Sequence, residues 1–494
     1  MALYGTKQDD MVADGLAEKD DSTISKTAEV EAQATDELDP KMDARLRRKL
    51  DLFIIPVFGI LYLLCFLDRG NIGNANVATP SISKSLGLTP TQYGACVSVF
   101  YSTYVISEPL WSVLTKVITP RILLTCSTLV WGGLTLGTAW SNQYGHLVAI
   151  RVLLGWFEGG LFPSLTVYLF MNFRREEVAR RISYIYLCSG LSGAVGGLIA
   201  TGLIRIESGS MVGWQYLYIV EGALSLSAAP LVFFTIPNRL QDAWFLNPAE
   251  KEGAVQRAQV LAKHNQHDEA FSWSQVVKGL TDWKAYTSGV TQFASCFTLY
   301  GVSTFMPAII KGMGYSNVNA QLLTVPVYLF AAIVYLILAR LSEKYACRGP
   351  FLFGGLVIVL IGYIMLATIS NVHARYAGLF LMASGLYSNP GLNISWVAGN
   401  TAGHYKRSAT FGINQLLGNS AGAAIGSIFL SSLAPRYIRS LWIGFGITLA
   451  GLLAVVFNTL MYRSLNKKRE QMCAEGAEDQ PHLGDLNPHF RYFM

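Results

Sequence analysis

Long apolar segments alternate with short polar segments from about residue 52 to residue 462. Each apolar segment is long enough for a helix, rising ~1.5 Å per residue, to cross a hydrocarbon core of ~30 Å. None shows the period-two alternation of a barrel strand, and backbone groups in lipid must find hydrogen bonds within their own segment. We therefore predict an all-α polytopic membrane protein with twelve transmembrane helices, at roughly 52–79, 93–115, 122–140, 146–172, 181–204, 215–236, 284–307, 321–342, 350–369, 375–399, 408–432 and 440–462.

The first apolar segment is interrupted by two charged residues, Asp68 and Arg69. A charge near the membrane centre costs ~2.5–3.5 kcal/mol on insertion scales, so ionisable residues at that depth usually face a cavity and carry function. Asp68, Asn71 and Asn74 recur at i, i+3 and i+6, which places them along one face of the helix. The structural alternative is that Asp68 and Arg69 cap a shorter helix at the membrane surface.

The composition agrees with a membrane protein. Only 14% of the 494 residues are charged and the mean hydropathy is +0.35, whereas soluble domains carry about 25% charged residues. The net charge of +6 comes from basic residues scattered among short loops, so we expect no nucleic-acid partner. The seven cysteines show no CxxC spacing, which argues against a disulfide framework or a zinc site.

The positions of Lys and Arg predict the orientation. RLRRK at 45–49 precedes the first helix and places the N-terminus in the cytosol. Eleven basic residues then fall in the short inside loops: Lys116, Arg121, Arg174, Arg175, Arg180, Arg181, Arg340, Lys344, Arg348, Lys406 and Arg407. Six fall in the short outside loops: Lys84, Arg205, Lys311, Arg375, Arg436 and Arg439. This bias predicts that both termini are cytosolic.

One long polar loop divides the helices into two sets of six. We predict a largely disordered cytosolic tail over 1–50, a six-helix bundle over 51–236, a cytosolic loop over 237–283, a second bundle over 284–462 and a cytosolic tail over 463–494. Similar glycine runs in the fifth and eleventh segments support a repeat. Parallel halves with a binding site between them are a common plan of secondary transporters.

The central loop contains a helix start. Asn247 is a favourable N-cap, Pro248 suits the first helical position and Glu250 lies in the first turn. His264 and His267 follow beside two acids. Metal binding by that group is the less favoured interpretation, and we predict no metal site.

Glu158 is a second deep carboxylate, near the middle of the fourth segment. Burial disfavours the charged form of a carboxylate, so Glu158 is suited to taking and releasing a proton. A substrate anion that bound Arg69 would free a paired carboxylate to accept that proton. The alternative is a static ion pair that pins two helices together.

Two further groups of polar residues are candidates. For a charge network or gate at the cytosolic face we select Glu108, Lys116, Arg121, Arg181 and Arg407, with helix capping and positive-inside anchoring as alternatives. For substrate binding we select, besides Arg69, the residues Asn71, Gln292, Tyr300, Asn393 and Asn414, although amides within spans often only bridge helices.

Enzyme chemistry finds little support. Gly418–Gly422 matches G-x-S-x-G, but that motif requires a strand–turn–helix context and this run lies in an apolar helix. The chain has no G-x-x-x-x-G-K-[ST] for ATP and no H-E-x-x-H for zinc. We expect no enzymatic activity and no cofactor.

At the level of whole motifs the chain resembles the anion:cation symporter family of the major facilitator superfamily, and within it the fungal allantoate, nicotinate and vitamin permeases. The resemblance rests on FLDRGNIGNA (66–75), EPLWSVLTKVITP (108–120), RVLLGWFEGGLFPS (151–164), RREEVARRISY (174–184), FSWSQVVKGLTDWKAY (271–286) and AGHYKRSATFGINQLLGNSAG (402–422). It implies two six-helix bundles, a central cavity and alternating access. It also implies proton coupling at Asp68 and Glu158 and organic-anion binding at Arg69.

The chain departs from the family pattern at two places. Pro109–Ser112 replace the usual residues after the second helix, and the fifth helix lacks the proline of the antiporter signature. The missing proline argues weakly against antiport.

The resulting hypothesis is a proton-coupled symporter that imports a small organic anion (a carboxylate, ureide or vitamin) across a plasma membrane, as a monomer. The alternatives are a proton antiporter that exports a secondary metabolite and a nutrient receptor that binds without transport.

Overall fold

The computed structural model describes residues 39–203, 206, 211–267, 273–345 and 347–494. The chain divides into two compact units. The smaller unit comprises Met1–Leu52 and Arg239–Asp268, and the larger one comprises Phe53–Asn238 and Glu269–Met494.

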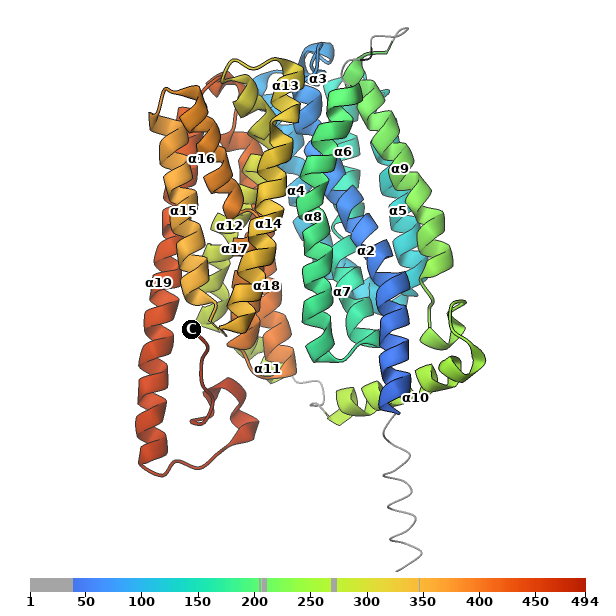
Figure 1. Cartoon of the computed structure of the whole chain (residues 1–494), viewed down its shortest axis with the longest axis vertical. Coiled ribbons are helices and arrows are strands. Elements are labelled where there is room, and N and C mark those ends of the chain that lie inside the picture. Colours follow the sequence, from blue (N-terminus) through green and yellow to red (C-terminus); the bar gives the residue numbers. More distant parts are fainter. Residues whose placement is uncertain (1–38, 204–205, 207–210, 268–272, 346) are drawn as a thin grey trace, which may run out of the picture. The chain divides into compact units, whose positions relative to one another are not determined.

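The larger unit consists of helices in two sets (Figure 1). The first set, the N-half, contains α2 (Pro40–Val77, which begins in the smaller unit), α3 (Ile82–Ser85), α4 (Pro90–Val117), α5 (Pro120–Thr138), α6 (Tyr144–Glu158), α7 (Leu161–Asn172), α8 (Arg175–Leu203) and α9 (Gly213–Thr235). The second set, the C-half, contains α11 (Trp273–Leu280), α12 (Trp283–Lys311), α13 (Asn317–Leu322), α14 (Thr324–Lys344), α15 (Gly349–Thr368), α16 (Val372–Ser384), α17 (Ser388–Gly399), α18 (His404–Ile428) and α19 (Ile438–Ala474), with 3-10 turns η2 (Ser431–Leu433) and η3 (Pro481–Leu486).

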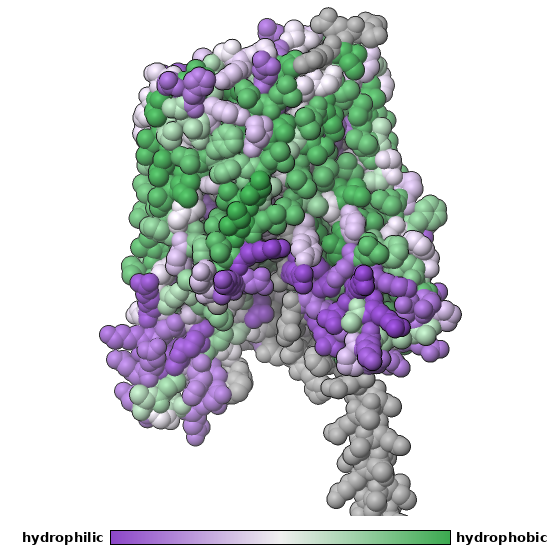
Figure 2. Space-filling model, viewed as in Figure 1, coloured by the Kyte–Doolittle hydropathy of each residue, from purple (hydrophilic) through white to green (hydrophobic). Residues whose placement is uncertain are grey.

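Each of the twelve predicted segments corresponds to one long helix or to a consecutive helix pair, so the predicted fold class is confirmed. Within the described residues, eight helices or helix pairs are long and apolar enough to cross a membrane. Leu329, Ile333 and Ile337 of α14 are exposed, as lipid-facing side chains would be. Figure 2 shows apolar side chains covering the face formed by α8 and α14.

Two predicted spans are broken at matching places in the two halves. The fourth is interrupted between α6 and α7, and the tenth between α16 and α17. In each case a proline follows the break, Pro163 in the third position of α7 and Pro390 in the third position of α17. Proline has no N–H for the helix ladder and is best accommodated in the first turn of a helix. Each break therefore places its proline where no helical hydrogen bond is lost, although α2, α4, α9 and α12 contain a proline without a break.

The two halves touch closely near α3, at what we call the α3 end of the bundle. A Cβ added to Gly94 of α4 would lie 2.2 Å from the carbonyl oxygen of Gly426 in α18, and one added to Gly426 would lie 1.9 Å from that of Gly94. Gly73 of α2 approaches Thr304 of α12 in the same way, at 2.0 Å. Larger residues would force these helices apart, because backbone cannot move aside as a flexible side chain can.

The chain beyond α19 folds back onto the C-half. Tyr492 stacks on Tyr462 of α19, with ring centroids 4.9 Å apart. Phe493 exchanges hydrogen bonds with the side chain of Asn400, and its carbonyl also accepts one from the Trp396 indole. The C-terminal segment, residues 477–494, is thus anchored through main-chain and aromatic contacts.

A charged cluster buries the acid of that segment. Asp485 is 1% exposed and accepts hydrogen bonds from Lys406 (2.8 and 2.9 Å) and from Lys284. Asp282 lies 2.9 Å from the Lys406 ammonium and 3.3 Å from that of Lys284. Two carboxylates and two ammonium groups therefore balance, which is the condition under which buried charges are tolerated.

The smaller unit joins the start of α2 to η1 (Leu240–Asp242) and α10 (Pro248–His267). Asn247 and Glu250 each accept a hydrogen bond at 2.9 Å from the other's backbone N–H, so the predicted helix start is confirmed as a reciprocal cap. The Lys49 ammonium donates to Glu250 at 2.6 Å, and Arg257 of α10 pairs with Asp43. These two ion pairs hold α10 against the first turns of α2.

Candidate functional site: a cavity between the two halves

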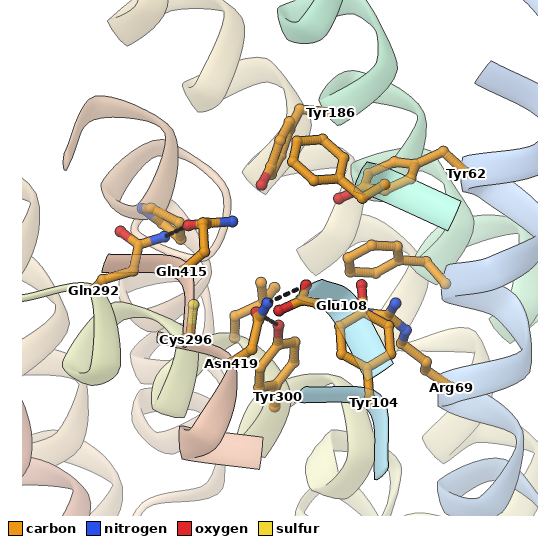
Figure 3. Close-up of a pocket in the computed structure, with 14 residues that line it drawn as sticks. Tyr62, Arg69, Tyr104, Glu108, Tyr186, Gln292, Cys296, Tyr300, Gln415 and Asn419 are labelled. Carbon is orange, nitrogen blue, oxygen red and sulfur yellow. Dashed lines mark hydrogen bonds between the residues drawn. The ribbon is translucent and has the colours of Figure 1, made fainter. Parts of the chain in front are cut away.

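A small cavity lies between the N-half and the C-half. The N-half lines it with Tyr62, Phe66, Arg69, Tyr104, Glu108, Phe162 and Tyr186. The C-half lines it with Gln292, Cys296, Leu299, Tyr300, Pro390, Gln415 and Asn419. In Figure 3 the arginine lies on the N-half side and the amides on the C-half side. Rings, one guanidinium, one carboxylate and neutral amides therefore dominate the lining.

Arg69 is the cation of this lining. Its Nε donates to Glu158 Oε2 at 3.4 Å and its Nη2 to the Cys65 sulfur at 3.2 Å. The guanidinium carbon lies 4.5 Å from the ring centre of Tyr104 and 4.7 Å from that of Phe66. Ring faces attract cations, and the planar fork of a guanidinium matches a carboxylate in a two-bond contact. Arg69 is thus held in place while it still faces the cavity.

Glu158 lies behind Arg69, at the break between α6 and α7. The side chain is fully buried, and of its two carboxylate oxygens only Oε2 has hydrogen-bond donors among the described residues, Arg69 and Cys65. Gly155 and Gly159 bring α6 close to α4, since a Cβ at either would lie 2.1 Å from an α4 atom. The structure therefore brings together Arg69 and Glu158 as a buried ion pair.

Asp68 points away from the cavity, although it is the neighbour of Arg69 in the sequence. Successive helix residues are about 100° apart around the axis, and Asp68 faces α9. Its Oδ1 accepts a hydrogen bond from Asn71 (3.3 Å) and its Oδ2 accepts one from Ser225 of α9 (3.2 Å). The candidate Asn71 therefore binds Asp68 and does not line the cavity.

The candidates in the C-half form an amide cluster. Gln292 Nε2 donates to Gln415 at 3.2 Å, and Asn393 donates to Gln292 at 2.8 Å. Gln292 lines the cavity, and Asn393 lies outside the lining and supports it. Asn414 is buried outside the lining, and neither of its side-chain polar atoms has a partner within the described chain.

A hydrogen-bonded chain crosses the cavity from one half to the other. The Tyr300 hydroxyl donates to Asn419 Oδ1 at 2.7 Å, and Asn419 Nδ2 donates to Glu108 Oε1 at 2.8 Å. Glu108, which we expected at the cytosolic face, thus lies within α4 and lines the cavity. The reason is the rotation of α4, which turns Glu108 toward Asn419 of α18.

The other candidates for a charge network lie at helix ends. Arg121 stacks on Phe233 at 4.0 Å, and Arg181 stacks on Phe173 at 3.9 Å. Arg407 donates to the Thr401 carbonyl at 2.8 Å. The side chain of the fifth candidate, Lys116, lies outside what the structure describes.

Sequence reasoning missed two buried ionisable residues. Glu221 of α9 is 1% exposed, and Arg151 of α6 is 3% exposed and donates to the Tyr218 hydroxyl at 3.2 Å. Both interrupt apolar segments, so the criterion that singled out Glu158 would have found them. The rings that line the cavity carry no comparable signal, because aromatic residues occur throughout the spans.

Comparison with known proteins adds three findings. The family model described as Major Facilitator Superfamily matches residues 59–427. An uncharacterised transporter of Schizosaccharomyces pombe is 39% identical over 478 residues, 97% of this chain and 95% of that protein. A high-affinity nicotinic acid transporter of Saccharomyces cerevisiae is 39% identical over 458 residues, 91% of this chain and 85% of that protein.

Among solved structures, the fold is similar to a partially occluded, inward-open conformation of the xylose transporter XylE from E. coli. The TM-score is 0.64 at 17% identity, over 82% of this chain and 98% of that one. At this identity the likeness concerns the fold.

Proposed function

Because the chain belongs to the major facilitator superfamily of membrane transporters, we propose that it imports a small organic anion together with a proton. The observation that carries this proposal is Arg69, the cation of the cavity lining, which is held by aromatic rings and by a buried carboxylate. An anion that enters the cavity meets its countercharge there.

The lining favours an aromatic or heteroaromatic carboxylate. The carboxylate would bind the guanidinium fork of Arg69, and the ring would stack among Tyr62, Phe66 and Tyr104. The amides of Gln292 and Gln415 lie on the opposite side and offer hydrogen bonds to a ring nitrogen or hydroxyl. The similarity to a nicotinic acid transporter supports this substrate class.

Glu158 would couple the anion to a proton. In this structure Glu158 pairs with Arg69. A bound carboxylate competes for the same guanidinium, and a buried carboxylate that has lost its partner is stabilised by taking a proton. The proton then enters with the anion, and the added charge is zero. Asp68 supplies a second protonatable group in the same half.

The arrangement supports alternating access with the α3 end outside. Close contacts between the halves, such as Gly94 with Gly426, lie between the cavity and the α3 end. We assign this state as inward-facing, with both termini cytosolic, in a plasma membrane. The outward-facing state would require these glycine contacts to separate.

The test is proton-driven uptake of radiolabelled nicotinate by the purified protein in liposomes. Asp68→Asn and Glu158→Gln are expected to abolish uphill accumulation. Arg69→Ala is expected to weaken carboxylate substrates more than their uncharged amides, because only the former need the guanidinium. Undiminished uphill uptake in both acid variants would refute the coupling assignment, and equal loss for acid and amide would remove Arg69 as the anion site.

The same liposomes distinguish the alternative functions. Accumulation driven by an inward proton gradient supports symport, whereas efflux driven by that gradient indicates an antiporter. Binding of nicotinate without flux in either direction indicates a receptor.

A further inference from the structure

A second polar site lies in the N-half, on the side of α2 that faces away from the cavity. α9 begins at the α3 end, where the Trp214 indole donates to Ser85 of α3 at 3.0 Å. Deeper in the bundle, Ser225 of α9 donates to Asp68 of α2. α2 runs toward the α3 end and α9 runs away from it, so the two helices are antiparallel.

This register places Glu221 beside Asn71. Glu221 precedes Ser225 by four residues, about 6 Å along α9 toward the α3 end, and Asn71 follows Asp68 by three residues, about 4.5 Å in the same direction. Tyr218, Glu221 and Ser225 fall at i, i+3 and i+7, on one face of α9. That face therefore presents Glu221 to the level of α2 that carries Asp68 and Asn71.

The site is poor in hydrogen-bond donors. Glu221 is 1% exposed and Asn71 is fully buried. The Asn71 amide donates to Asp68 and is also the side-chain donor that interacts with Glu221, so one amide serves two carboxylates. No close hydrogen bond reaches either carboxylate oxygen of Glu221 or the amide oxygen of Asn71 in the described part of the chain. Buried acceptors with too few donors are costly, and one added proton would turn a carboxylate oxygen into a donor.

The N-half also has fewer cations than carboxylates within its spans. Between the ends of its six predicted spans, its described residues carry four carboxylates, Asp68, Glu108, Glu158 and Glu221, and two guanidinium groups, Arg69 and Arg151. Arg69 is paired with Glu158, and Arg151 binds the Tyr218 hydroxyl one turn from Glu221. Neighbouring carboxylates with too little countercharge do not both ionise.

We propose that Asp68, Asn71 and Glu221 form a proton-binding site apart from the substrate cavity, in which Glu221 holds a proton and shares it with Asp68. The site fits a proton better than a sodium ion. Three oxygen atoms are unoccupied, and α2 and α9 are continuous helices here, whereas sodium sites in transporters also use unwound backbone carbonyls. The role of this site in transport rests on the proposed proton coupling, whereas the existence of the site does not.

The first test is thermal unfolding of the purified protein across pH, which does not depend on transport. Glu221→Gln reproduces the shape and donor of the protonated acid at every pH. If folded Glu221 binds a proton that the unfolded chain releases, the wild type loses stability as pH rises above the ordinary glutamate value of about 4.3 and E221Q does not share that loss. The unfolding temperature of E221Q should therefore rise relative to wild type across this range. Asp68→Asn should also flatten the profile, because Glu221 then ionises without a like charge beside it.

A matched control is Glu343→Gln, which makes the same charge change at the exposed end of α14 and should leave the pH profile unchanged. Parallel profiles for E221Q and wild type would overturn the proposal. Stabilisation of the wild type by sodium chloride over choline chloride would also overturn it, in favour of a sodium site.

The second test is transport. With one proton per anion, a pH difference of one unit drives about tenfold accumulation. E221Q should lose this accumulation and keep exchange of labelled for unlabelled nicotinate, which needs no net proton movement. If the wild type itself shows no proton-driven accumulation, the proposed function fails while the pH profile still reports on the site. If E221Q accumulates like the wild type, the site plays no part in coupling and the proposal is wrong.

Discussion

Asp485→Asn is expected to lower the stability of the folded protein, because it disrupts the charged cluster that anchors the C-terminal segment. The carboxylate is buried between Lys284 and Lys406, with Asp282 as the second acid of the cluster. Asparagine keeps the shape and one acceptor oxygen but removes the charge. Two buried ammonium groups then share one carboxylate. A buried charge without its full countercharge is what makes breaking a buried ion pair costly.

The magnitude follows from this geometry. Removing one partner of a buried pair costs about 3–5 kcal/mol, and the lower value applies because Asp282 stays in contact with both lysines. An unfolding entropy of about 2.1 cal/mol/K per residue converts 3 kcal/mol into a shift of about 3 °C if both halves unfold together, and about 6 °C if the C-half unfolds alone.

The cluster also predicts the pH dependence of this loss. Burial alone would lower the pKa of Lys406, but its hydrogen bonds to Asp485 and Asp282 raise the pKa above the ordinary value. A lysine whose pKa is raised by folding stabilises the fold at every pH below its unfolded pKa of about 10.4. This stabilisation is lost only as pH rises through the folded pKa. The effect of D485N should therefore be constant between about pH 6 and about pH 9.

The assay is thermal unfolding in detergent, with Glu478→Gln as the control, since it makes the same charge change at an exposed position shortly before Asp485. In a Lys406→Met background the cluster already lacks one cation, so D485N should cost less there. Equal unfolding temperatures for D485N and E478Q, or the same cost in both backgrounds, would refute this account of the cluster.

Two further predictions concern other parts of the chain. Gly426→Ala should abolish transport without unfolding the protein, because its Cβ would meet the Gly94 carbonyl and keep the α3 end open. Uptake by G426A at the wild-type rate would contradict this contact. The control is Gly446→Ala, where an added Cβ meets nothing within 4 Å. In the smaller unit, burial alone would raise the pKa of Glu250, but hydrogen bonds from Lys49 and from the backbone of the α10 cap lower it. The ionised carboxylate thus stabilises the smaller unit above the unfolded pKa of about 4.3, and this stabilisation is lost as pH falls below that pKa. Glu250→Gln should therefore speed amide exchange in α10 at neutral pH and have little effect at about pH 3. Equal effects at both pH values would refute the role of the charge.

The sequence predicted the helices well because the membrane imposes one simple requirement. A span must be apolar, long and helical, and this pattern is visible at every one of the twelve segments. The cap at Asn247 was predictable for a similar reason, since a helix start depends on three or four neighbouring residues.

The site was predictable only in part. Arg69 and Glu158 could be identified from the sequence because they are charged residues within apolar segments. That Asp68 faces α9 while Arg69 faces the cavity depends on the rotation of α2, which a single sequence does not specify. The position of Glu108 likewise depends on the rotation of α4, and the partners of Asp485 lie far away in the chain. Contacts between distant segments are set by packing, and local patterns carry no record of them.

The uneven placement of charge bears on how such a protein diversifies. The charged residues of the cavity lining, Arg69 and Glu108, belong to the N-half, whereas the C-half contributes only neutral side chains to that lining. Exchanging one neutral side chain for another in α12 or α18 reshapes the C-half side of the cavity without removing a charge. Selection for a new ligand can thus proceed on one half while the other keeps the Arg69–Glu158 ion pair. Chimeras that exchange C-halves between relatives would change the preference for substituents on the anion and keep the requirement for a carboxylate.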